Sequence, residues 1–180
     1  MSIEQSPKRP LQLSTHIAHT NDYYRVREDL VEWPNGYRKP YWVVEGWSAV
    51  CVIAIKDGRL LTVHQFRYPI QKESLELPMG RANDNETPAQ AAARELREET
   101  GFVAETMVSL GTVYSLNGVC NVPMHAFLAE GLTLTERELD PQEHGLTADW
   151  TPLEDWRRMI RENVITDSET LACWAMYLAR

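Results

Sequence analysis

The stretch from Gly80 to Phe102, GRANDNETPAQAAARELREETGF, constrains the fold of this chain more than any other segment. Thr87 stands where a helix N-cap is expected, Pro88 takes the first helical position, and Gln90 is placed to complete a capping box. The alanines that follow favour continuation of a helix. Gly101 is the residue type that commonly lies just past a helix C-terminus. The sequence therefore predicts a helix that begins at Pro88 and stops before Gly101.

This predicted helix gathers negative charge on one face near its C-terminal end. Glu95, Glu98 and Glu99 stand at positions i, i+3 and i+4, where like charges cost roughly 0.2–0.5 kcal/mol per pair, and the helix dipole disfavours anions there. Oxygen ligands without a neighbouring Cys or His favour Mg²⁺ or Mn²⁺ over zinc. The tract RELREE alone is ordinary surface sequence. Like charges gathered where they are locally unfavourable are what a cation site looks like, so a metal site and a solvated helix end both stay open at this point.

Composition and charge exclude several classes of function. The chain has 180 residues, 43% of them apolar, which suits one globular domain with a full core. A net charge of −8 with no Lys/Arg run argues against binding to nucleic acid or an anionic membrane. We expect no signal peptide, and no apolar run approaches the ~20 residues that span a bilayer. Three widely spaced cysteines predict no disulfide framework and a cytoplasmic location.

The remaining pattern predicts a mixed sheet with helices on both sides, an α/β sandwich. Residues 21–45 are expected to form an antiparallel hairpin, and residues 1–20, with weak periodicity, to be partly mobile. Strands are predicted at about residues 47–55, 59–66, 103–114, 124–128 and 148–150. Thr151 is expected to cap a second helix that ends near Glu162, and Asp167 or Ser168 to cap the last one. Ala89, Ala92, Ala93 and Leu96 are expected to pack on the sheet.

The register of the stretch from Gly80 to Phe102 matches the Nudix box: Gly, five residues, Glu, seven residues, then Arg-Glu-apolar-any-Glu-Glu-any-Gly-apolar. The chain therefore resembles the Nudix hydrolase superfamily. Three flanking segments narrow the resemblance to its ADP-ribose pyrophosphatase, or nucleoside diphosphate sugar hydrolase, branch over about residues 21–178. They are Val63–Pro69, Leu75–Gly80 and Ile160–Thr170.

The resemblance implies a Nudix-type α/β/α sandwich with an N-terminal hairpin and a set of metal ligands. Glu95, Glu98, Glu99 and the backbone carbonyl of Met79 are the expected ligands of Mg²⁺, for which Mn²⁺ is a possible substitute. Glu98 and Glu99 are also expected to be catalytic. Arg94 joins them as the box arginine that orients the carboxylates.

The resemblance also implies three substrate-binding residues. Arg67 is expected to bind a substrate phosphate. Glu76 stands among apolar neighbours, so it is expected to pair with Arg67 or Arg81 or to face the metals. Trp47 is the first candidate for stacking on the nucleobase.

Two further aromatic residues, Tyr24 and Trp42, are weaker candidates for stacking. In this branch such a site forms across a homodimer in which the N-terminal hairpin is exchanged. We therefore expect residues 1–45 to be an N-terminal extension and hairpin that forms a dimer, and residues 46–180 to be the Nudix hydrolase domain.

One departure from the branch concerns the general base. The branch places a Glu at about the position of Val122, where this chain has none. Glu143, in the acidic segment of residues 138–144, is the best-placed candidate to activate water. Selectivity for substrate is what this departure affects most.

The expected function is Mg²⁺-dependent hydrolysis of the pyrophosphate bond in a nucleoside diphosphate linked to X, such as ADP-ribose or a nucleotide sugar. The products would be a nucleoside monophosphate and a sugar phosphate. Two alternatives stay open: a Nudix hydrolase of dinucleoside polyphosphates or modified nucleoside triphosphates, and, with less support, a non-catalytic nucleotide sensor. A sensor would be expected to lose box glutamates, and all are present here.

Overall fold

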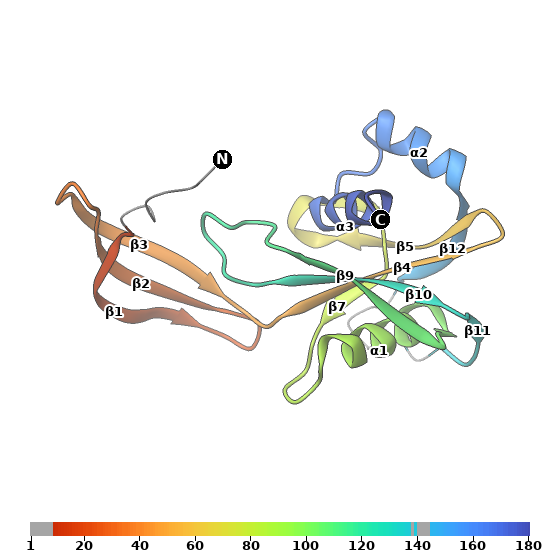
Figure 1. Ribbon diagram of the computed structural model, residues 1–180, viewed down its shortest axis with the longest axis horizontal. Coiled ribbons are helices and arrows are strands. Elements are labelled where there is room, and N and C mark those ends of the chain that lie inside the picture. Colours follow the sequence, from red (N-terminus) through yellow and green to blue (C-terminus); the bar gives the residue numbers. More distant parts are fainter. Residues whose placement is uncertain (1–8, 138, 140–144) are drawn as a thin grey trace. The chain divides into compact units, whose positions relative to one another are not determined.

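The computed structural model describes residues 9–137, 139 and 145–180 of the chain (Figure 1). These residues form two compact units. The first contains the residues up to 47 together with 116–122, and the second contains 48–115 and 123–180.

The first unit is built on a three-stranded antiparallel sheet in the order β1-β2-β3. Its strands are β1 (Leu11–Thr20), β2 (Arg25–Glu32) and β3 (Arg38–Glu45). The predicted hairpin within residues 21–45 is confirmed as β2 and β3.

Strand β1 gives residues 11–20 a regular structure that their weak periodicity did not predict, and the partial mobility of residues 1–20 stays a prediction. It pairs with β2 from Leu11 opposite Glu32 to Thr20 opposite Arg25. Every side chain of β1 is exposed. The strand is therefore held by its backbone ladder and leaves no alternation of buried and exposed positions in the sequence.

The second unit contains a seven-stranded mixed sheet, which confirms the predicted class of fold. Its central order is β12-β5-β4-β10-β9, with β6 paired to β5 and β7 paired to β4. Strand β10 runs parallel to β4, and the other pairs are antiparallel. The strands are β4 (Ala49–Lys56), β5 (Arg59–Arg67), β6 (Lys72–Glu76), β7 (Met79–Arg81), β9 (Thr106–Val113), β10 (Met124–Glu130) and β12 (Thr147–Pro152).

Three short elements complete this unit beside the main sheet. A 3-10 turn, η1 (Tyr68–Ile70), follows β5. Strands β8 (Phe102–Val103) and β11 (Thr133–Leu134) form a small antiparallel ladder of their own. The sequence pattern predicted neither β6, β7 nor β11, because strands of two to five residues are too short to show a period.

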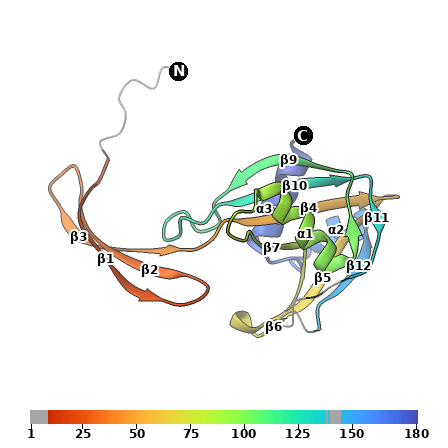
Figure 2. The ribbon, with the colours of Figure 1, turned by 90° about the horizontal axis from the view of Figure 1, so that it is seen from below.

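Helices cover both faces of the sheet, as predicted (Figures 1 and 2). They are α1 (Pro88–Thr100), α2 (Leu153–Arg161) and α3 (Ser168–Leu178). Alternation along β4 explains the layers, since successive side chains of a strand point to opposite faces. Val50, Val52 and Ala54 pack in the cluster that contains Leu96 of α1. Cys51 and Ile53 pack in the cluster that contains Trp156 of α2 and Cys173 and Trp174 of α3.

Both ends of α1 and the C-terminal end of α2 agree with the sequence prediction, and the start of α2 does not. Thr87 and Gln90 form the reciprocal capping box, and Gly101 ends α1 at φ 78°. Thr151 does not cap α2: it lies in β12, opposite Leu60, and the helix begins two residues later.

The buried face of α1 also differs in detail from the expectation, whereas the cap of α3 agrees with it. On α1, Ala91 is buried whereas Ala93 is exposed. On α3, the predicted cap at Asp167 is confirmed, since its side chain accepts a hydrogen bond from the Thr170 N–H. In the part of the chain that the structure describes, no helix has the length and apolar character needed to cross a membrane.

Candidate active site

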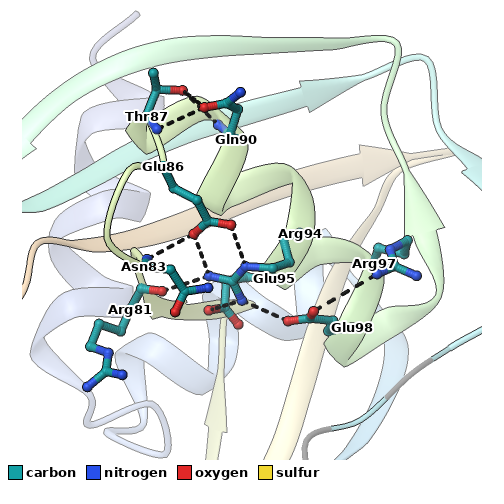
Figure 3. A network of polar contacts seen from close by, with 9 residues as sticks. All are labelled: Arg81, Asn83, Glu86, Thr87, Gln90, Arg94, Glu95, Arg97 and Glu98. Carbon is teal, nitrogen blue, oxygen red and sulfur yellow. Dashed lines mark hydrogen bonds and ion pairs between the residues drawn. The ribbon is translucent and has the colours of Figure 1, made fainter. Parts of the chain in front are cut away.

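Arg94 lies at the centre of a polar network on α1 (Figure 3). Its guanidinium donates to both carboxylate oxygens of Glu86, at 2.9 and 3.0 Å. It also donates to Glu95 at 2.8 Å, to Glu98 at 2.7 Å and to the Arg81 carbonyl at 2.8 Å. Hydrogen bonding to Glu86, and then to Glu98 and Glu95, raises the pKa of Arg94, so the group stays charged. The predicted contact between Arg94 and the box carboxylates is confirmed.

Glu86 connects this network to the turn that precedes the helix. Its carboxylate accepts a hydrogen bond from the Asn83 N–H at 2.9 Å. Together with the hydrogen bond from Arg94, which is the largest cause, this lowers the pKa of Glu86 to about 2. Glu86 is therefore ionised at neutral pH and holds Arg94 in place.

Glu95 and Glu99 are buried, with exposures of 5% and 2%. Glu99 Oε2 accepts a hydrogen bond from the Met79 N–H at 3.0 Å, which ties α1 to the start of β7. The Glu95 carboxylate lies against Gly80. A Cβ at that position would stand 2.2 Å from the Glu95 carboxyl carbon, so only glycine leaves room for this side chain where it now lies.

The chemistry of these groups fits a hard divalent cation. Three carboxylates lie on one helix, and the Met79 carbonyl belongs to the strand that Glu99 contacts. All four groups offer oxygen, which Mg²⁺ and Mn²⁺ prefer. Among the described residues, no three His, Cys, Asp or Glu side chains already stand in a metal-binding arrangement. Here the carboxylates bond to Arg94 and to the Met79 N–H, so a cation would share or replace those contacts.

Arg67 and Glu76 form an ion pair at the end of β5. Arg67 Nε donates to Glu76 Oε1 at 2.8 Å, and Arg67 Nη2 bonds to Oε2. Glu76 is only 1% exposed, and an unpaired buried carboxylate would be costly. Of the three environments expected for Glu76, pairing with Arg67 is confirmed. The same hydrogen bond raises the pKa of Arg67.

The ion pair lines a cavity of about 370 Å³, together with Ser74 and the segment of residues 166–169 that leads into α3. Glu169 is a carboxyl group in this cavity that the sequence pattern did not single out. Burial, and then the charge of Asp167, raise the pKa of Glu169, while a hydrogen bond from Ser115 opposes them. No local signal could have found it, because Ser115 and Arg67 lie far away in the sequence.

The aromatic candidates lie in the first unit. Trp47 and Tyr24 line a cavity of about 450 Å³ together with Arg25, Glu45 and Asn121. Part of the lining is polar, since Glu45 accepts from Arg25 Nε at 2.6 Å and from Asn121 Nδ2 at 3.2 Å. Trp42 does not line this cavity. Its side chain is 52% exposed and donates to Glu28 at 3.1 Å.

The proposed general base is not placed by the structure. Glu143 lies outside the described residues, so its role stays a prediction. Val122, at the position where the branch carries a Glu, is half-buried, and its Cγ2 lies 3.0 Å from where a Cβ on Gly46 would stand.

Comparison with known proteins finds a matching family model, related sequences and a similar structure. A family model described as "NUDIX domain" matches residues 45–172. The ADP-ribose pyrophosphatase of Bacillus subtilis is 36% identical over 143 residues, covering 78% of this chain and 77% of that protein. The methanol dehydrogenase activator of Bacillus methanolicus is 34% identical over 150 residues, covering 82% and 80%. A crystal structure of an "ADP compounds hydrolase" superposes with a TM-score of 0.85 at 20% identity, covering 98% of this chain and 96% of that one, which shows the fold.

Proposed function

Because the chain belongs to the Nudix family, we propose that it hydrolyses the pyrophosphate bond of a nucleoside diphosphate linked to a second group X. ADP-ribose or a nucleotide sugar is the proposed substrate. The products are a nucleoside monophosphate and a sugar phosphate. The observation that carries this proposal is the complete box: Glu95 and Glu98 bond to Arg94, and Glu99 bonds to the Met79 N–H. The ADP-ribose pyrophosphatase of B. subtilis supports the choice of substrate.

In this proposal Glu95, Glu98, Glu99 and the Met79 carbonyl hold Mg²⁺, for which Mn²⁺ can substitute. A bound Mg²⁺ neutralises charge on the diphosphate and lowers the pKa of a bound water. Arg94 keeps the carboxylates of Glu95 and Glu98 on one side of the helix. The Gly80 backbone leaves room for Glu95.

Arg67 and Glu76 bind the substrate in the proposal. Glu76 accepts from both Nε and Nη2 on one edge of the Arg67 guanidinium, which fixes its orientation. The Arg67 side chain is still 40% exposed, so it can contact a phosphate oxygen. Glu143 is the proposed base that takes the proton from water.

We also propose that Trp47, with Tyr24 in the lining of the same cavity, stacks on the nucleobase. Homodimer formation through residues 1–45 is proposed alongside it, with residues 46–180 as the hydrolase domain. Supporting the dimer, Leu11, Leu13 and Ile17 are exposed on β1.

We propose a cytoplasmic location for the protein. Its support is that Cys51, Cys120 and Cys173 are all free thiols.

The test of this function is a hydrolysis screen with Mg²⁺ over ADP-ribose, nucleotide sugars, NADH and dinucleoside polyphosphates, with products identified. We expect AMP and ribose 5-phosphate from ADP-ribose. Glu98→Gln is the matched control, because an amide of the same shape is a poor ligand for Mg²⁺. Pyrophosphate released from a triphosphate, with ADP-ribose untouched, would favour the alternative Nudix substrates. Nucleotide binding without any turnover would point to a sensor.

A further inference from the structure

The chain changes strand partner immediately before the proposed metal-binding carbonyl. Glu76, the last residue of β6, pairs with Val63 of β5. Met79, the first residue of β7, pairs with Cys51 of β4. Leu77 and Pro78 make the crossing, so the Leu77 N–H lies outside both ladders and Pro78 has no N–H at all. A buried N–H at such a crossing needs a partner from elsewhere.

Three different elements supply hydrogen bonds to this crossing. The Leu77 N–H donates to Thr170 Oγ1 of α3 at 3.1 Å. The Pro78 carbonyl accepts from the Val52 N–H of β4 at 2.8 Å. The Met79 N–H donates to Glu99 of α1 at 3.0 Å. The backbone that presents the Met79 carbonyl is therefore held from both faces of the sheet and from within it.

Thr170 is the only side chain on the α3 side of the sheet that the described residues show bonded to this crossing. It is fully buried, and its own N–H donates to the Asp167 cap at 2.7 Å. The cap fixes the first turn of α3, which keeps the Thr170 hydroxyl pointed at Leu77.

We infer that Thr170 is a positioning residue for the metal site. It holds the Leu77 N–H and thereby sets the direction of the Met79 carbonyl two residues later. This inference rests on the proposed function, in which that carbonyl is a metal ligand. Groups that orient metal ligands in this way typically change metal affinity by about 10–100-fold when they are removed.

Valine matches threonine in shape but cannot accept a hydrogen bond. In Thr170→Val the Leu77 N–H would be buried without a partner, which favours a shift of the crossing toward another acceptor. Because Pro78 and Met79 follow directly, such a shift moves the Met79 carbonyl. Thr170→Ser keeps the hydroxyl and loses only a methyl group, so it should keep the carbonyl in place.

The experiment measures Mn²⁺ binding by the full chain, from the electron paramagnetic resonance signal of free Mn²⁺, with thermal unfolding recorded in parallel. Cys173→Ala is the control for loss of packing, since Cys173 is fully buried one turn later on α3. We expect Thr170→Val to weaken Mn²⁺ binding by about 10–100-fold. Thr170→Ser and Cys173→Ala should bind Mn²⁺ like the wild type although both lower the unfolding temperature. If Thr170→Val does not fold, Thr170→Ala takes its place with the same expectation.

Two outcomes would overturn the inference while leaving the proposed function intact. In the first, the wild type hydrolyses ADP-ribose and Thr170→Val binds Mn²⁺ as tightly as the wild type does. In the second, Thr170→Ser and Cys173→Ala weaken Mn²⁺ binding as much as Thr170→Val does, which would make Thr170 a packing residue only. Absence of Mn²⁺ binding in the wild type would instead refute the proposed metal site itself, and this inference with it.

Discussion

Replacement of Gly80 by alanine should weaken metal binding while leaving the stability of the fold nearly unchanged. The added Cβ would lie 2.2 Å from the Glu95 carboxyl carbon and 2.3 and 2.4 Å from its two oxygens. Ordinary contact begins at 3.4 Å, so the carboxyl carbon must retreat by about 1.2 Å, the difference between the two distances. The end of a glutamate side chain can make that movement, whereas the strand backbone of β7 stays paired with β4.

The expected effects on stability and on function have different sizes. Gly80 does not have a positive φ, so alanine fits its backbone and restricts the unfolded chain, a gain of roughly 0.4–1 kcal/mol that offsets part of the rearrangement. Metal–ligand distances in a genuine site lie within about 0.2 Å of their standard values. A misplacement of about 1 Å in a reacting group can cost about 10²-fold in rate. We therefore expect Gly80→Ala to unfold near the wild-type temperature while kcat/KM for ADP-ribose falls about 100-fold.

The assay compares thermal unfolding, Mn²⁺ affinity and kcat/KM in wild type, Gly80→Ala and Gly118→Ala. Gly118 is the matched control, because a Cβ there would meet nothing within 4 Å. Wild-type Mn²⁺ affinity and turnover in Gly80→Ala would refute the argument, since Glu95 could then not be a ligand at its present position.

Three further predictions concern charge and stacking. Glu86→Gln should lower the free energy of unfolding at pH 7. Lowering a pKa from 4.5 to about 2 corresponds to ~3 kcal/mol, which screening of a side chain 23% exposed reduces to about 1–2 kcal/mol. Because the pKa of Glu86 is lower in the folded than in the unfolded protein, the extra stability of the wild type should shrink as the pH falls from 4.5 toward 2. Denaturant titrations over this range measure the free energy of unfolding of both proteins, and a difference that stays constant with pH would contradict the reasoning. Glu169→Gln should instead raise the free energy of unfolding at neutral pH, because the raised pKa of Glu169 in the folded protein means that its ionised form is destabilising there. This gain should be lost below pH 4.5, where the carboxyl is protonated in both states. No gain at pH 7 would count against the burial of this carboxyl. Trp47→Ala should raise KM for ADP-ribose more than it lowers kcat, and an unchanged KM would make Trp47 a packing residue.

Local interactions could be predicted from the sequence, because the residues that make them are separated by the few positions that one or two helical turns span. Thr87, Gln90 and Gly101 set the ends of α1 through contacts within a few residues. Arg94 reaches Glu98 for the same reason, because residues four positions apart lie on the same face of a helix. The mixed sheet and its two helical layers also followed from the pattern of strands and helices.

Long-range pairing decided the rest, because no local pattern records which distant strand or helix a residue meets. Strand β1 exists through its ladder with β2 and buries no side chain, so it has no apolar period. Thr151 looked like a helix cap and instead continues β12 beside β5. The contact between Thr170 and Leu77 joins residues 93 positions apart. The box thus specified the carboxylates from sequence alone, whereas the tertiary structure decided what holds the carbonyl opposite them, since backbone groups take their partners from whichever element folds against them.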